Sequence, residues 1–215
     1  MIHQGALTGN LAEVTTKKSA LVSIQQRGNA FSVSSITGTI NAALAANSAI
    51  FAMRFDAGAG NKKAYVERIR IAHTTIVAYT TPLTAGRRLA VYRGSGANAS
   101  GGTAIATIAK KHSASADSEF ETAQGGDVRI ATTGALTVTG ITFETNEFAT
   151  MPLVHAGAAG AFFEQLFEFN ANESAPIVLE PGQLLAIRNP QAMDAAGTWQ
   201  AAVRIDWYEE DSLTL

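Results

Sequence analysis

The clearest pattern of hydrophobic and polar positions lies near the C-terminus, between residues 179 and 210. Apolar residues there occupy every second position: Trp199, Ala201, Val203, Ile205 and Trp207 alternate with Gln200, Ala202, Arg204, Asp206 and Tyr208. A period of two predicts a strand with one buried face and one more polar face. Pro181-Gly182 predicts a turn before the apolar run Leu184–Ile187. We therefore predict two core strands of an antiparallel β-domain.

Similar short apolar patterns recur along the rest of the chain. They predict further strands at residues 48–55, 65–76, 87–93, 104–108, 128–131, 136–143 and 162–169. In the second of these, we expect Ile69 and Ile71 to face away from Val66. Residues 56–61 predict a glycine-rich turn, residues 94–102 a hairpin tip, and residues 112–127 a polar loop.

One segment has two possible structures. The apolar residues within 35–47 recur with the spacing of a short helix. The sequence Thr37-Gly38-Thr39 interrupts a helical start, however, and would also suit a strand followed by a turn.

The spacing of these elements predicts the fold class. Nine or ten short strands, separated by turn residues, are typical of an all-β antiparallel sandwich with a jelly-roll-like arrangement. No internal repeat or linker divides the chain, so we expect one β-sandwich domain at residues 31–215. Residues 1–30 have no sustained period and predict an extended N-terminal arm, although an ordinary flexible terminus is the simpler alternative. Its apolar residues, Leu7, Leu11, Val14, Leu21 and Ile24, are candidates for docking onto the domain or a neighbouring subunit.

Composition narrows the possible partners. Charged residues make up 16% of the chain, against roughly 25% in typical soluble domains. Either much of the surface is buried against partners, or small polar residues cover it. The net charge of −2 argues against binding nucleic acid. Residues 28–53 carry no charge between Arg27 and Arg54, yet their many Asn, Ser and Thr residues argue against a membrane span.

The sequence predicts no catalytic site, cofactor or metal centre. The four histidines, His3, His73, His112 and His155, are isolated, and the absence of cysteine excludes disulfides and thiolate ligands. Glu164 and Glu168 could form a carboxylate pair with Glu144 or Glu147, as a glycosidase requires. They alternate with phenylalanines, however, as the polar positions of a half-buried strand do. No nucleophile motif is present.

Three stretches resemble a known group of proteins. They are TGTINAALAANSAIFAMRF at residues 37–55, VERIRI at 66–71, and LLAIRNP followed by GTWQAAVRIDWYEE within 184–210. Together they resemble structural proteins of tailed bacteriophages, and the match covers most of the chain in outline. The resemblance implies a jelly-roll protein of the virion, and within the virion a capsid decoration (cement) protein, made in the host cytoplasm. It supplies no active-site residue.

We therefore hypothesise a decoration protein whose partners are the major capsid protein and copies of itself, as a dimer or trimer. Candidate interface residues are those named in the arm, together with Tyr92, Arg204, Asp206 and Tyr208, which lie on the more polar faces of predicted strands. Two alternatives remain. One is a tail fibre or receptor-binding module that presents residues 94–102 and 112–127 to a host glycan, and the other is a glycan-active enzyme.

Overall fold

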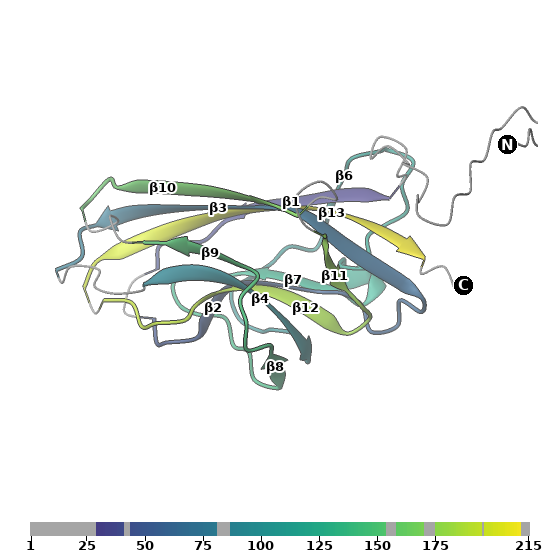
Figure 1. The fold of residues 1–215 in the computed structure, drawn as a ribbon, viewed down its shortest axis with the longest axis horizontal. Coiled ribbons are helices and arrows are strands. Elements are labelled where there is room, and N and C mark those ends of the chain that lie inside the picture. Colours follow the sequence, from purple (N-terminus) through teal and green to yellow (C-terminus); the bar gives the residue numbers. More distant parts are fainter. Residues whose placement is uncertain are drawn as a thin grey trace, which may run out of the picture.

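The protein is an all-β sandwich of two antiparallel sheets packed face to face (Figure 1). The computed structural model describes residues 29–40, 44–80, 87–153, 158–169, 175–194 and 196–211. Within these ranges there are thirteen strands and one short 3₁₀ turn, Thr122–Gln124, and no α-helix. The predicted fold class is confirmed.

The six-stranded sheet contains both the first and the last strand of the fold. Its order is β10 (Phe162–Glu168), β3 (Lys62–Val77), β13 (Thr198–Asp211), β1 (Ala30–Ile36) and β6 (Ala109–Lys110). The sixth strand, β11 (Ile177–Leu179), pairs with β3 beyond the end of β10. The long β3 and β13 form its centre, and β10 and β6 are its edges (Figure 1).

The seven-stranded sheet forms the other layer. Its order is β5 (Thr103–Ala104), β7 (Asp127–Ile130), β2 (Ser48–Arg54), β12 (Gln183–Asn189), β4 (Arg88–Gly96) and β8 (Ile141–Phe143). The seventh strand, β9 (Ala149–Pro152), also pairs with β4. The two strands predicted near the C-terminus, β12 and β13, therefore lie in opposite layers.

The connections follow the jelly-roll arrangement. Eight strands carry it: β1, β2, β3, β4, β9, β10, β12 and β13. Numbered one to eight along the chain, they pair as 1-8-3-6 in one sheet and 2-7-4-5 in the other. This is the pairing that two interlocked Greek keys produce.

The face of β13 that was predicted to be buried lines the core. Trp199, Val203, Ile205 and Trp207 are each at most 1% exposed. The Trp207 ring centroid lies 5.9 Å from that of Phe31 in β1 and 5.2 Å from that of Phe120. Phe120 belongs to the loop between β6 and β7, so this loop contributes to the core as well as to the surface.

Two β-bulges in β3 correct the predicted faces of that strand. Asp206 and Trp207 are adjacent in β13, but they pair with Arg68 and Val66, so Glu67 is an extra residue in β3. An extra residue reverses the in-out alternation beyond it. Val66 is consequently buried on the same face as Ile69, and its predicted position on the opposite face is wrong. A second bulge lies at Ile76, between Thr75 and Val77.

The possible helix at residues 35–47 is also wrong for the described residues of that range, 35–40 and 44–47. Ser35 and Ile36 end β1, Ile40 forms an isolated bridge with Trp199, and Asn47 lies in a turn with φ = 64°. Ile40 is fully buried, as an apolar stripe would require. In the described residues of this segment, the alternative prediction of a strand followed by a turn is correct.

The predicted hairpin tip at residues 94–102 is wrong, because β4 and β5 lie at different places in the sheet and do not pair. Gly94–Gly96 instead extend β4 and pair with β8. Gly96 has φ = 125°, and a Cβ atom there would lie 2.2 Å from the carbonyl oxygen of Gly140. Close packing against β8, rather than a turn, therefore requires glycine at this position.

Candidate interaction surface

The outer face of the six-stranded sheet presents side chains in regular rows. Strand register defines them, from β10 to β1, as Glu164–Ala72–Ala202–Ile36, Leu166–Arg70–Arg204–Ser34, and Glu168–Arg68–Asp206–Ser32. A further row, Phe162–Thr74–Gln200, lies nearer the start of β10. We call these four rows the outer face. They combine small, apolar and charged residues on one surface formed by four strands.

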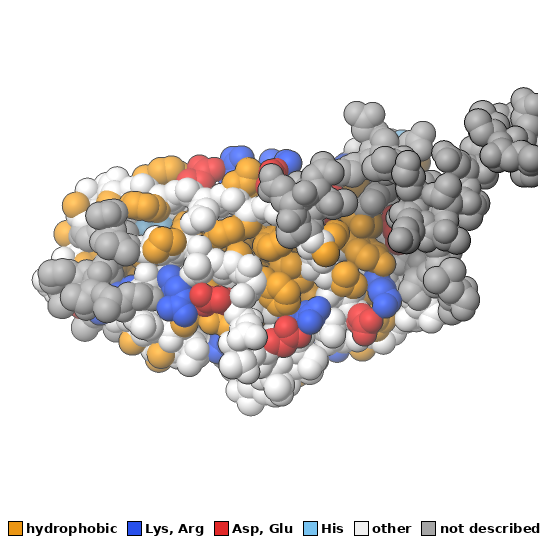
Figure 2. All heavy atoms as spheres, viewed as in Figure 1, with side chains coloured by type: hydrophobic (Ala, Val, Ile, Leu, Met, Phe, Trp, Pro, Cys, Tyr) orange, Lys and Arg blue, Asp and Glu red, His pale blue; other side chains and the backbone are white. Residues whose placement is uncertain are grey.

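Ion pairs cross the middle of the outer face. Arg70 lies 3.0 Å from Glu164, and Arg68 lies 2.7 Å from Glu168, each pair linking β3 to β10. Asp206 of β13 lies 2.8 Å from the Lys111 ammonium. Acidic and basic side chains accordingly lie side by side above β10 and β3 (Figure 2). Each carboxylate therefore already has a cationic partner within the chain.

Asp206 is the most enclosed of these acids. Burial by itself would raise the pKa of its carboxyl group. Hydrogen bonds and attraction from Lys111 and Arg204 outweigh that burial, and the net pKa lies below the ordinary value. Asp206 is thus an anion held at neutral pH.

Exposed apolar side chains gather at one end of the outer face. Phe162 begins β10 and is 59% exposed, and Ile36 ends β1 and is 58% exposed. Ile76 and Val77, at the end of β3, are also exposed, and Leu166 is 41% exposed farther along β10. Single exposed apolar residues are ordinary, whereas contiguous apolar patches are typical of interaction surfaces, so the outer face is a candidate for one.

The structure separates the candidate interface residues. Leu7, Leu11, Val14, Leu21 and Ile24 lie outside the described residues. Tyr92 is buried in the seven-stranded sheet, where its hydroxyl donates to Glu147 Oε2 (3.1 Å) and Arg188 lies over its ring. It is therefore on the other layer, away from Arg204, Asp206 and Tyr208.

The three candidates in β13 do share the outer side of one strand. The Arg204 side chain is 53% exposed, but Asp206 is 4% and Tyr208 is 5% exposed. The Tyr208 ring stacks on that of Tyr65, with centroids 4.8 Å apart. Asp206 and Tyr208 make contacts within the subunit, so Arg204 is the most accessible of the three to a partner, and their interface role stays a prediction.

A buried carboxylate fixes the loop beside β6. Glu209 Oε1 accepts hydrogen bonds from Ser118 Oγ (2.6 Å) and Trp207 Nε1 (3.0 Å), and its Oε2 accepts one from the Glu119 amide (3.0 Å). Burial raises the pKa of Glu209, although these three donors act in the opposite direction. We call this arrangement the Glu209 latch, because it joins the last strand to the loop that carries Phe120.

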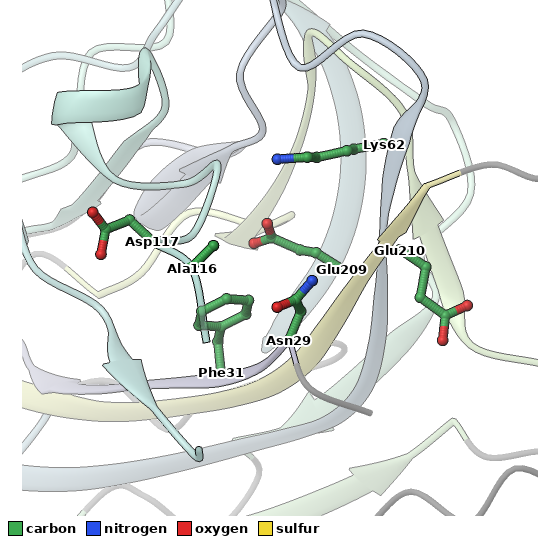
Figure 3. Close-up of a pocket in the computed structure, with 7 residues that line it drawn as sticks. All are labelled: Asn29, Phe31, Lys62, Ala116, Asp117, Glu209 and Glu210. Carbon is green, nitrogen blue, oxygen red and sulfur yellow. The ribbon is translucent and has the colours of Figure 1, made fainter. Parts of the chain in front are cut away.

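A small cavity lies next to the Glu209 latch. Its volume is about 40 Å³, and Figure 3 shows Asn29, Phe31 and Glu209 facing Ala116 and Asp117, with Glu210 directed away. Lys62 lines the same cavity and forms an ion pair with Glu119. Space of this size suits one or two water molecules, and is far below the roughly 300 Å³ of a small-molecule site.

The sequence-derived candidates for chemistry are dispersed. Glu144 pairs with Arg93 (2.6 Å) and Glu147 with Arg88 (3.0 Å), both on the seven-stranded sheet, whereas Glu164 is in the other layer. An open groove beside Glu144 is lined by Gly94, Ser95, Thr142, Phe143 and Gln183. The groove includes one acidic side chain, which already pairs with an arginine.

His73 is the only histidine in the described residues that is buried. Its ring stacks on Trp199, with centroids 5.1 Å apart, and its Nε2 lies 3.4 Å from the Tyr79 hydroxyl oxygen. Burial lowers the pKa of His73 to about 4. In the part of the chain that the structure describes, no cluster of three or more His, Asp or Glu side chains is arranged to hold a metal ion.

Two features of the site were missed by sequence reasoning. The residues of β10 that face outward, Phe162 and Leu166, alternate with Phe163 and Phe167, and that pattern was available as a signal for an edge strand apolar on both faces. Glu209 gave no local signal, because two of its three hydrogen-bond donors, Ser118 Oγ and the Glu119 amide, lie about 90 residues away.

No protein-family model matches the chain, and no curated protein shows significant similarity to it. Among the described residues, no helix is both long enough and apolar enough to cross a membrane.

Proposed function

We propose that this chain is a structural protein of a tailed bacteriophage particle, and that it decorates the capsid lattice as a symmetric oligomer. The observation that supports this most is the outer face of the six-stranded sheet, with its ion-pair rows and the exposed apolar residues at one end. The sequence resemblance supports the same role. Mechanically, such a protein adds apolar contacts between lattice units, at roughly 25 cal/mol per Å² before association costs are subtracted.

Copy number in purified particles tests this proposal. The copy number of a decoration protein should approach that of the major capsid protein, as judged from band intensities in a stained gel of virions from the source phage. Absence of the chain from those virions would contradict a structural role. Amounts of only tens of copies per particle would favour the tail-fibre alternative over decoration.

The described loops give the tail-fibre alternative less support. A receptor-binding loop needs side chains free to meet a glycan. The loop from Lys111 to Gly126 instead buries Phe120 and is held by the Glu209 latch. Gly94–Gly96, at the start of the other candidate loop, belong to β4.

The N-terminal arm can be tested separately. Deletion should remove residues 1–28, because Ala30 begins β1 and the Asn29 carbonyl accepts a hydrogen bond from the Glu209 amide (3.0 Å). We expect a folded domain that no longer binds capsids. Full occupancy of capsids by the truncated protein would refute the role of the arm.

Arg204→Ala addresses the outer face. Arg204 is exposed, so its loss should leave the domain folded while reducing capsid binding. The matched control is Arg129→Ala in the seven-stranded sheet, which should not change capsid binding. Equal binding by Arg204→Ala and wild type would remove this residue from the interface.

A further inference from the structure

Strand β10 is an open edge of the six-stranded sheet. It pairs with β3 along seven consecutive residues without a bulge, and among the described residues no strand pairs with its other side. It contains no proline, and Phe162 and Leu166 are exposed on it. A strand edge of this length offers unpaired backbone groups to another strand.

The hydrogen bonds to β3 show which backbone groups are available. Thr75 N donates to Ala161 O, and Phe169 N donates to Glu67 O, so the odd-numbered residues of β10 face β3. In an antiparallel ladder, alternate residues direct their N–H and C=O to opposite sides. The groups of Phe162, Glu164, Leu166 and Glu168 therefore point to the open side.

We propose that two copies of this chain pair through β10 about a two-fold axis, with the antiparallel register centred on Gln165. The sheets of both copies then become one continuous sheet. The residues with available backbone groups form four hydrogen-bonded pairs: Phe162 with the partner's Glu168, Glu164 with the partner's Leu166, and the two symmetry-related pairs. Such pairs provide about eight backbone hydrogen bonds.

Side chains select this register. On the inner side, Phe163 lies opposite the partner's Phe167, and Gln165 lies opposite the partner's Gln165. Aromatic pairs and amide pairs across strands are favourable. On the outer side, each glutamate lies opposite an apolar residue and keeps its own Arg68 or Arg70.

The neighbouring registers are less favourable, because they place like charges opposite one another. A shift of two residues in one direction places Glu164 opposite the partner's Glu164, and a shift in the other places it opposite the partner's Glu168. Like charges directly opposite one another destabilise a strand pair. Shifts by one residue are excluded, because they would pair available groups with groups already bonded to β3.

This dimer would provide the self-association that the proposed function requires. The inference itself rests only on the geometry of β10. The first test is the mass of the purified full-length chain by light scattering. We expect twice the 22.5 kDa of one chain. A monomer at high concentration, or a closed trimer, would overturn the two-fold pairing.

Proline substitutions separate pairing between copies from pairing within the fold. Leu166→Pro removes an N–H on the open side, so the chain should stay folded while its dimer dissociation constant rises by roughly 10-fold or more. The matched variant Phe167→Pro removes an N–H that faces β3 and should lower the unfolding temperature instead. Dimerisation of Leu166→Pro with wild-type affinity would overturn the proposal.

Single cysteines test the register directly, because the natural chain has none. Positions opposite one another outside the hydrogen-bonded pairs have Cα atoms about 4.5 Å apart, within the range for a disulfide. Under a mild oxidant, Gln165→Cys should therefore cross-link faster than Glu164→Cys, Leu166→Cys or the distant control Ile36→Cys. Fastest cross-linking at position 164 or 166 would overturn the register centred on Gln165. Cross-linking of Gln165→Cys no faster than Ile36→Cys would overturn the interface.

The outcomes also distinguish this inference from the proposed function. A monomeric chain that still decorates particles would refute the β10 dimer and leave the particle role standing. A dimer that is absent from particles would leave the β10 dimer standing and refute the particle role.

Discussion

The two edges of the six-stranded sheet are built differently. At one edge, β6 pairs with β1 through only two residues, and Lys110 and Lys111 place charge there. The Glu209 latch fastens the following loop next to this edge. At the other edge, β10 is seven residues long, unbulged and partly apolar.

Native proteins avoid unwanted strand pairing by shortening, charging or covering their sheet edges. The β6 edge is shortened to two residues, and both edges carry ion-paired charges, whereas β10 is long and also exposes apolar side chains. This difference between the two edges is the basis of the proposed pairing of two copies through β10.

The largest effect should come from the core beneath the protected edge. Trp207→Ala removes a ring packed against Phe31 and Phe120 and should lower the free energy of unfolding by about 3–5 kcal/mol. Urea denaturation measures this. The control Leu166→Ala, on the open edge, should change the free energy of unfolding of the monomer by about 0.5 kcal/mol or less. Equal losses in both variants would contradict the contrast between edges.

His73, which pairs with Phe163 of β10, should make stability depend on pH. Its folded pKa is about 4, below the ordinary value of 6.5, so the unfolded chain binds a proton first as the pH falls. Stability should therefore fall between pH 6.5 and 4, by up to about 3 kcal/mol from this group. The difference between wild type and His73→Phe isolates the contribution. Identical pH profiles for the two proteins would refute it.

Breaking the Glu209 latch should have a smaller and more local effect. Glu209→Gln keeps the shape but replaces a charged acceptor of three hydrogen bonds, at a cost of about 2 kcal/mol. Limited proteolysis should then cut within residues 111–126. The adjacent Glu210→Gln, on the exposed face, should leave this loop resistant. A resistant loop in Glu209→Gln would show that other contacts hold it.

The smallest effect should come from the ion pairs of the outer face. Both partners of Arg70–Glu164 are more than one third exposed, so water and salt screen their attraction. Arg70→Ala should change the free energy of unfolding of the monomer by about 0.5 kcal/mol or less. A loss several times larger, measured in the same urea titration, would mean that this pair does more than neutralise the edge.

The strands that could be predicted from sequence are those whose alternation is uninterrupted. The period-two pattern of β13 predicted its buried tryptophans correctly. In β3 the same reasoning misplaced Val66, because the bulge at Glu67 depends on pairing with residues about 140 positions away. The loop that carries Phe120 looked polar, and its buried role depends on Trp207 and Glu209 in the last strand.

The candidate site, too, could be predicted only in part from the sequence. Alternation placed Arg204, Asp206 and Tyr208 together on one side of β13, as the structure has them. It grouped them with Tyr92, which lies in the other sheet, because local patterns do not assign strands to layers. The open edge of β10 depends on the order of strands, which the sequence pattern alone did not define.

Amide hydrogen exchange in β10, measured by NMR at low and high protein concentration, tests the central claim most directly. The amides of Phe163, Gln165 and Phe167 face β3 and should be protected at both concentrations. The amides of Glu164, Leu166 and Glu168 should become protected only at the high concentration, when β10 pairs with a second copy, whereas β6 should show no such change. Rapid exchange of the Glu164, Leu166 and Glu168 amides at every concentration would contradict the account.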